Sequence, residues 1–215
     1  MWTRLVQASI CVHVKDTMLQ FDKEKLKATI LYTCTLCEAA ELGAVKMHKV
    51  LYFFDMLHYA QVGSPATGAT YRKSAHGPTC DALLPMLREM EAAGEIRVRE
   101  VDYFGYRKKE FHALTEPEIQ RFSGAERALL DEVIDFVCRD NTAKTISDFS
   151  HGRAWEIAEF GEVIPYHGAL HLFPDQVSLE AMDWASGEEA EIEAARQEGD
   201  PLGYPLFSDL RARVS

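Results

Sequence analysis

The sequence predicts a mainly α-helical domain with one β-hairpin, an α+β class, followed by an acidic C-terminal helix. Several long segments carry apolar residues at the spacing of an amphipathic helix. A single stretch, residues 95–114, instead alternates apolar and polar residues around Phe104-Gly105. Acidic residues crowd into residues 175–200. With 215 residues and 47% hydrophobic composition, the chain is long enough to bury one sizeable core.

Two helices are expected to open the domain. In residues 24–42, Leu26, Ile30, Cys34 and Cys37 recur at helical spacing, and Gly43 follows as a natural residue just beyond a helix end. The second helix covers about residues 44–61, and a loop rich in glycine, proline and threonine follows at 62–70. The second helix should bury Met47, Val50, Leu51, Phe54 and Leu57.

A third helix is predicted at 79–93, because Gly77-Pro78 suits a helix start and Gly94 suits its end. Pro85 then predicts a kink or a separate short turn. The hairpin follows. The order of three helices and a hairpin also describes a winged-helix arrangement, in which the hairpin is the wing and residues 79–93 are the candidate recognition element.

The second half of the domain begins with a capping box, Ser123 followed by Glu126, which predicts a helix at 124–139. Residues 141–160 indicate a short helix, a break at His151-Gly152 and a further helical turn. Residues 161–177 resemble a loop and 178–198 an acidic helix. We therefore expect an N-terminal extension at 1–23, a domain at 24–174 and an acidic helix and tail at 175–215.

Bulk properties narrow the function classes. A formal net charge of −11 makes the chain a poor generic phosphate binder, because such binding relies on lysine and arginine. No apolar run approaches the roughly 20 residues of a membrane-spanning helix. The start of the chain lacks a convincing signal-peptide pattern. Five scattered cysteines fit reduced thiols better than disulfides, so we expect a cytoplasmic protein.

One polar stripe on the second helix stands out. His48, Tyr52, Asp55 and Tyr59 follow the pattern i, i+4, i+7, i+11, so they line one side of a helix. His48 and Asp55 would lie about 10 Å apart along the axis, too far to share one hydrogen bond. The pattern therefore favours a polar flank or a partner-facing surface over a catalytic or metal site.

The other candidate sites in the sequence have less support than this stripe. Neither a metal nor a cofactor is predicted. The Cys34-x-x-Cys37 pair lies within a helical pattern and indicates small buried hydrophobic residues. A hydrolase would need a scattered site built from His48, Asp55, His76 and His151. A DNA-binding regulator would use Arg107, Lys108 and Lys109 at the hairpin, although acidic residues surround them and nucleic acid is an unfavoured partner.

An ordered set of short motifs resembles the Panacea domain, the family of SocA-type antitoxins. The resemblance covers about residues 44–172. It is carried by Lys46, Lys49 to Phe53 and Asp55, by Gly63, Ala66-Thr67-Gly68, Tyr71 and Gly77-Pro78, by Gly94-Glu95-Ile96, and by Ser147, Ser150, His151, Trp155 and Ile164 to Tyr166.

The resemblance implies a non-catalytic antitoxin of bacterial or phage origin that binds a cognate protein toxin directly. It leaves open whether the antitoxin also presents the toxin to a protease or chaperone. Tyrosine offers rigid apolar area with a polar tip, which suits a contact surface. The expected partner-binding residues are His48, Tyr52, Asp55, Tyr59, Thr67, Tyr71, His76, Gly77, Pro78, His151 and Trp155.

Overall fold

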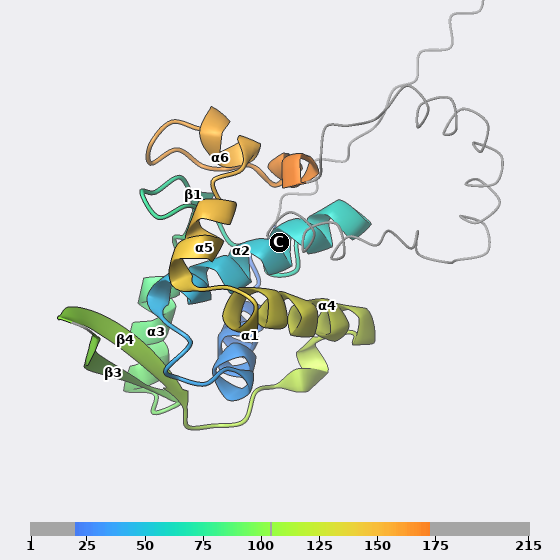
Figure 1. Ribbon diagram of the computed structural model, residues 1–215. Helices are drawn as coiled ribbons and strands as arrows, with labels where there is room; N and C mark the ends of the chain where they lie inside the picture. Colours follow the sequence, from blue (N-terminus) through green and yellow to red (C-terminus); the bar gives the residue numbers. More distant parts are fainter. Residues whose placement is uncertain (1–19, 104, 173–215) are drawn as a thin grey trace, which may run out of the picture.

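The computed structural model describes residues 20–103 and 105–172, and Figure 1 shows how their elements are arranged. The mainly helical class with one long hairpin is confirmed. The helices are α1 (Lys23–Leu36), α2 (Ala44–Val62), α3 (Leu83–Ala92), α4 (Gly124–Ile134), α5 (Ala143–Phe149) and α6 (Arg153–Ile157). The strands are β1 (Tyr71–Arg72), β2 (Thr79–Cys80), β3 (Ile96–Tyr103) and β4 (Tyr106–Ala113), and the short helical turns are η1 (Ile119–Arg121), η2 (Asp135–Arg139) and η3 (Tyr166–Leu172).

Helix α2 is the centre of the domain, and α1, α4, α5, η3 and β2 all pack against it. Eleven of its residues are buried, and they include consecutive positions from Lys49 to Leu57. A helix that is buried around most of its circumference belongs to the core. We expected one face of this helix to be buried and the polar side beside it to be partly exposed to solvent. That expectation was wrong, because neighbouring elements cover both of these sides of α2.

The hairpin is confirmed as an antiparallel pair. Its register runs from Ile96 opposite Ala113 to Tyr103 opposite Tyr106. Gly94 adopts a left-handed conformation with φ of 73° just after α3, which lets the chain reverse into β3. The order of α1, α2, α3 and hairpin matches the expected order, while the winged-helix comparison stays a prediction.

Two helix boundaries differ from expectation. Helix α1 ends at Leu36 rather than at residue 42, because Cys37 has an extended conformation, and Gly43 is the residue that precedes α2. Helix α3 starts at Leu83 rather than 79, since Thr79 and Cys80 pair with β1. Pro85 therefore lies in the first turn of α3, where no backbone donor is needed and no kink results.

The capping box is confirmed: the Ser123 hydroxyl accepts from the Glu126 N–H and the Glu126 carboxylate accepts from the Ser123 N–H. The expected helix at 124–139 continues from α4 into a wider π-helical turn, η2, that buries Phe136, Val137 and Cys138. The break near His151 separates α5 from α6 as expected.

The segment expected as a loop at 161–177 is only partly a loop. Residues from Tyr166 to Leu172 form the 3₁₀ turn η3, which packs against α2 and α6. The expected acidic helix at 178–198, the tail and most of the N-terminal extension lie outside the described residues.

Candidate partner-binding face

A buried carboxyl group, that of Asp55 on α2, joins three distant parts of the chain. Its Oδ1 accepts from the Thr67 N–H, and its Oδ2 is 2.6 Å from the Thr67 hydroxyl, 2.7 Å from the Tyr71 hydroxyl and 3.2 Å from the Tyr166 hydroxyl. Asp55 is 0% exposed, and burial is the main reason why its pKa is raised above the ordinary value. The carboxyl group thus fixes the loop at 63–71 and η3 onto α2.

The hydrogen bonds of this cluster can be satisfied by a protonated carboxyl group. The Tyr71 hydroxyl is also 2.7 Å from the Leu51 carbonyl oxygen, and the Tyr166 hydroxyl also meets the Ala69 carbonyl oxygen. Each tyrosine has one proton to donate. If both protons go to these carbonyls, a proton on Asp55 Oδ2 supplies the remaining hydrogen bond, which agrees with the raised pKa of Asp55.

The structure corrects the expected contact stripe. Tyr52, Asp55, Thr67 and Tyr71 are each no more than 1% exposed, so they cannot touch a partner in this conformation. Tyr59 is half-buried and stacks on Tyr166, with ring centroids 5.7 Å apart. Helical periodicity correctly placed the four stripe residues on one side of α2, but that side packs against the loop and η3 rather than facing solvent.

A second polar cluster lies under Gly77-Pro78, which is also buried rather than exposed. The Lys49 ammonium group donates to the Pro78 carbonyl oxygen at 2.8 Å, and Lys49 is 1% exposed. Burial lowers the pKa of Lys49 to about 7. Gly77 has φ of 84°, and a Cβ there would lie 2.2 Å from Ser150 Oγ and 2.7 Å from Lys49 Nζ. The glycine is therefore required both by its conformation and by the close approach.

Replacing Lys49 with methionine is expected to change how stability depends on pH. Because the folded pKa of Lys49 is depressed to about 7, the unfolded state binds more protons between that pH and about 10.4, so its contribution to stability rises with pH there. The free energy of unfolding of the wild type, relative to that of the variant, should rise by up to about 1.4 kcal/mol per pH unit. Urea denaturation of both proteins between pH 6.5 and 9 measures this difference, and a constant difference would contradict it.

His48 has a structural partner of its own. Its Nδ1 accepts from the Cys80 N–H at 3.0 Å, and burial lowers its pKa to about 4. His48 therefore stays neutral near pH 7 and anchors β2 to α2. Within the described residues, the partners of Asp55 are Thr67, Tyr71 and Tyr166, so the structure does not pair Asp55 with His48 as a scattered hydrolytic site would require.

An aromatic and cationic group stands closer to the surface, at α6. The His151 ring stacks on Trp155 with centroids 4.1 Å apart, and the Lys73 ammonium group lies 4.1 Å from the centroid of the Trp155 ring. The indole N–H of Trp155 donates to the Ser74 carbonyl oxygen at 3.0 Å. His76 nearby is exposed. Of the expected contact residues, His76 is thus exposed, and the half-buried ones are His48, Tyr59, His151 and Trp155.

Exposed apolar side chains continue this region along the chain. From the end of α6 into η3, the exposed fractions are 66% for Ile157, 75% for Phe160, 41% for Val163 and 64% for Leu170. A small cavity of about 280 Å³ lies between α6 and η3, with Ile157 and Val163 in its lining. Soluble domains rarely expose several large apolar residues together unless they bind something. We name residues 151–172 with His76 the α6 face; it lies at the top of the view in Figure 1.

The sequence reasoning missed the apolar half of the α6 face. Phe160, Val163 and Leu170 lie in a segment that was expected to be a loop, and their exposure was not considered. A usable signal was present, because large apolar residues within a segment without clear periodicity have no helix face through which to be buried.

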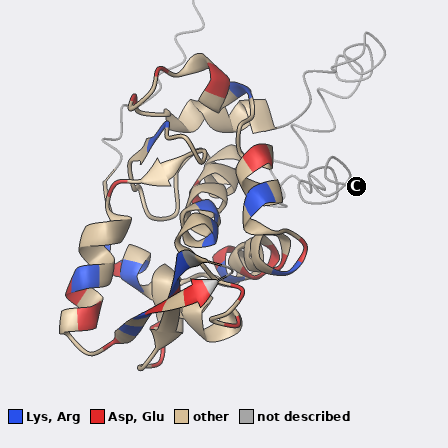
Figure 2. Cartoon of the chain, turned by 60° about the vertical axis from the view of Figure 1, so that its left-hand side comes forward, with Lys and Arg blue, Asp and Glu red and all other residues tan. Residues whose placement is uncertain are grey.

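The basic hairpin residues have acidic or carbonyl partners nearby. Arg107 lies 3.5 Å from Glu100, and the Lys108 ammonium group donates to the Ala40 carbonyl oxygen. Figure 2 shows blue and red positions side by side on the hairpin and the helices. Across residues 20–103 and 105–172, no group of three His, Cys, Asp or Glu side chains could hold a metal ion, and no helix there is long and apolar enough to cross a membrane.

Comparisons with known proteins identify the family. No curated protein and no solved structure matches the chain. The family described as Antitoxin SocA-like, Panacea domain, matches residues 47–156, just over half of the 215 residues. The match starts within α2 and ends within α6, so it contains Lys49, Asp55, Gly77, His151 and Trp155. The chain therefore belongs to the SocA-like antitoxin family with a Panacea domain.

Proposed function

We propose that this protein is an antitoxin that neutralises a cognate protein toxin by direct binding, and that the α6 face makes the contact. Membership of the antitoxin family supports the role and implies a toxin as partner. The exposure of Ile157, Phe160 and Leu170, in the same segment of the chain as Trp155, is the observation that supports the location. Proteins bury such apolar side chains at the centres of interfaces.

The α6 face has the physical properties of a protein-binding site. Trp155 is held by its hydrogen bond to Ser74, by His151 and by Lys73, so little conformational freedom would be lost when a partner covers it. The buried Asp55 and Lys49 clusters lie beneath and fix η3 and the Gly77 turn in place. On this proposal the family motif residues support the contact surface from inside, and nothing is chemically transformed.

Replacing Phe160 with serine is expected to weaken toxin binding about thirtyfold while leaving stability unchanged, because truncating a central interface anchor typically costs about 2 kcal/mol. The partner to use is the product of the neighbouring gene, expressed from an inducible promoter. The wild type should restore growth and the variant should not. Titration of the purified proteins gives the change in affinity.

Leu84 on α3 provides the matched control, since it is an exposed apolar residue away from the α6 face, at 48% exposure. Leu84→Ser should neutralise as well as the wild type. Equal loss in both variants would reject the α6 face as the contact site. A neighbouring gene product that is harmless alone and does not bind would reject the toxin-neutralising role itself.

The lifetime of the toxin distinguishes two modes of neutralisation, namely simple binding and delivery to a protease. We propose simple occupation of the toxin in the cytoplasm, where the buried free thiols of the described cysteines would stay reduced. The half-life of the toxin should then stay constant or rise when the antitoxin is co-expressed. A half-life that falls, and is restored when a host protease is deleted, would instead show delivery to that protease.

A further inference from the structure

Two thiols from distant parts of the chain meet beside the end of α1. The Cys138 thiol on η2 donates a hydrogen bond to the sulfur of Cys37, the residue that follows α1. A second contact joins the same two segments, because the Arg139 guanidinium group reaches the Leu36 carbonyl oxygen at 3.5 Å. The thiol that pairs with Cys37 therefore comes from another segment, and not from within the Cys34-x-x-Cys37 motif.

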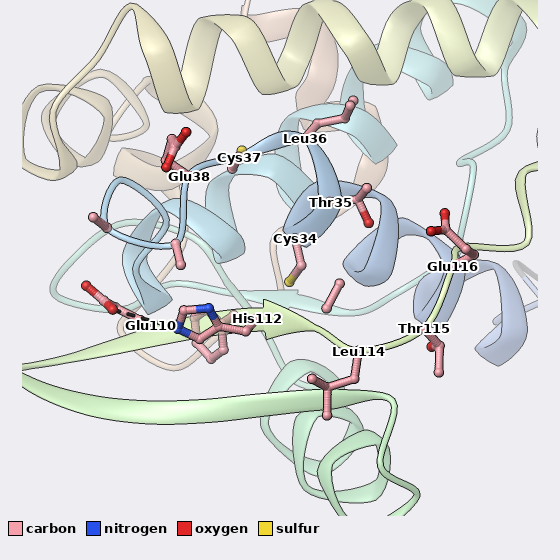
Figure 3. Close-up of a pocket in the computed structure, with 14 residues that line it drawn as sticks. Cys34, Thr35, Leu36, Cys37, Glu38, Glu110, His112, Leu114, Thr115 and Glu116 are labelled. Atoms are coloured by element: carbon pink, nitrogen blue, oxygen red, sulfur yellow. Dashed lines mark ion pairs between the residues drawn. The ribbon is translucent and has the colours of Figure 1, made fainter.

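The backbone at the end of α1 separates Cys37 from Cys34. Cys37 has an extended conformation, with φ of −97° and ψ of 139°, so it does not continue the helix on which Cys34 lies. In Figure 3 the Cys34 sulfur points towards β4, whereas the Cys37 sulfur points away from it. A disulfide needs two Cβ atoms that lie about 4 Å apart and face each other. The direction of the Cys37 sulfur thus favours Cys138 as a disulfide partner.

A cleft gives small molecules access to Cys37. The end of α1 and β4 enclose a volume of about 760 Å³, and Cys37 is part of its lining (Figure 3). Cys37 is 8% exposed, whereas Cys138, at the edge of a neighbouring cleft, is 2% exposed. Hydrogen peroxide is little larger than water, so it can enter the cleft while the domain stays folded. Cys37 is the thiol that it meets first.

The surroundings of the pair stabilise the thiolate of Cys37 rather than that of Cys138. The pKa of Cys37 is lowered by the hydrogen bond from Cys138 and by the charges of Arg139 and Lys46, against the opposing effects of burial and Glu41. The pKa of Cys138 is raised, because its proton is held in that hydrogen bond and because the thiol is buried. The thiolate is the nucleophile in thiol chemistry, so Cys37 is the attacking residue.

We propose that Cys37 and Cys138 are an oxidisable thiol pair, which hydrogen peroxide converts to a disulfide within the folded domain. The Cys37 thiolate attacks one peroxide oxygen, the O–O bond breaks and hydroxide leaves, so that Cys37 becomes a sulfenic acid. The Cys138 sulfur then attacks the sulfenic sulfur, and water leaves with the thiol proton. In all, the two thiols lose two electrons and two protons, and peroxide is reduced to two molecules of water.

The proposal goes beyond toxin binding and does not rest on it. The disulfide would tie the end of α1 to η2, whereas the α6 face lies at the top of the view in Figure 1. The cross-link forms only when peroxide is present, so the thiols are reduced under ordinary cytoplasmic conditions. Its test needs no partner protein, and the outcome of the toxin-binding experiments leaves it unaffected.

The test treats the purified full chain with hydrogen peroxide near neutral pH, blocks the remaining thiols with N-ethylmaleimide and digests the protein with trypsin. Peptide 28–46, which contains Cys34 and Cys37, should be joined to peptide 128–139, which contains Cys138, with the loss of two hydrogen atoms. Fragmentation of the joined peptides in the mass spectrometer should place the bond on Cys37. A bond between Cys34 and Cys37, no bond at all, or a bond that forms only in urea would overturn the proposal.

Three serine variants check the order of the two steps. Cys138→Ser should leave a sulfenic acid on Cys37 that dimedone labels, whereas Cys37→Ser should leave Cys138 unlabelled. Cys80→Ser is the matched control, since Cys80 is also buried, at 3% exposure, and it should form the disulfide as the wild type does. Loss of the disulfide in the Cys80 variant as well, or dimedone on Cys138 in place of Cys37, would contradict the proposal.

Discussion

Replacing Asp55 with alanine is expected to lower the free energy of unfolding by about 4 kcal/mol, the largest effect among the changes considered. The Tyr71 and Tyr166 hydroxyls lose one partner each but keep their carbonyl acceptors. The Thr67 N–H and the Thr67 hydroxyl lose their acceptor in a buried space. Each such group costs about 1–3 kcal/mol. Urea denaturation followed by circular dichroism measures the loss.

Asparagine at position 55 is the matched comparison, because its amide keeps the shape and can donate where a protonated carboxyl group would. Asp55→Asn should therefore lose only about 1 kcal/mol. A loss as large as that of the alanine variant would contradict the protonated state inferred from the proton count.

The two proteins should also differ in their pH dependence. The folded pKa of Asp55 is raised, so its contribution to stability is fully present below the unfolded pKa of about 3.9 and is lost as pH rises through the folded pKa. The wild type should lose stability relative to Asp55→Asn over that interval. A stability difference that does not change with pH would show that the pKa of Asp55 is the same in the folded and unfolded states.

The second large effect is expected at Gly77. An alanine there must adopt φ of 84° and would place its Cβ 2.2 Å from Ser150 Oγ and 2.7 Å from Lys49 Nζ. The conformational strain of about 1–2 kcal/mol adds to an overpacking cost of similar size, so Gly77→Ala should lose about 3 kcal/mol. Thermal or urea unfolding of the purified variant measures this loss.

Gly63 separates the two causes. It has φ of 76°, and a Cβ there would meet no atom within 4 Å. Gly63→Ala should therefore show only the conformational cost, about 1 kcal/mol. If the two variants lose the same stability, the close approach of Gly77 to Lys49 and Ser150 has no energetic consequence and the packing argument is wrong.

The features that the sequence predicted well depend on neighbours in the chain. The hairpin follows from alternation within 20 residues, and the start of α4 follows from Ser123 and Glu126, three positions apart. The end of α1 was wrong because the apolar spacing continues through Cys37 while the backbone there is extended. Strands β1 and β2 have two residues each, too few to show any alternation.

The site was harder to predict, because its contacts join distant segments. Helical spacing showed that Tyr52 and Asp55 share a side of α2, but it could not show that Tyr166, more than a hundred positions away, reaches the same carboxyl group. Polar residues at helical spacing occur both on the solvent-exposed side of a helix and in a buried polar cluster. Only the partners at Thr67, Tyr71 and Tyr166 distinguish the two.

The hydrogen bond of Tyr166 to Asp55 has a mechanical consequence. Tyr166 opens η3, the last described element, and its hydroxyl reaches the middle of the central helix. A force applied to the chain beyond Leu172 therefore reaches α2 within a few residues. Neither α6 nor the hairpin has to detach first. Unfolding that starts from the C-terminal side should consequently disrupt the packing around α2 early and in one step.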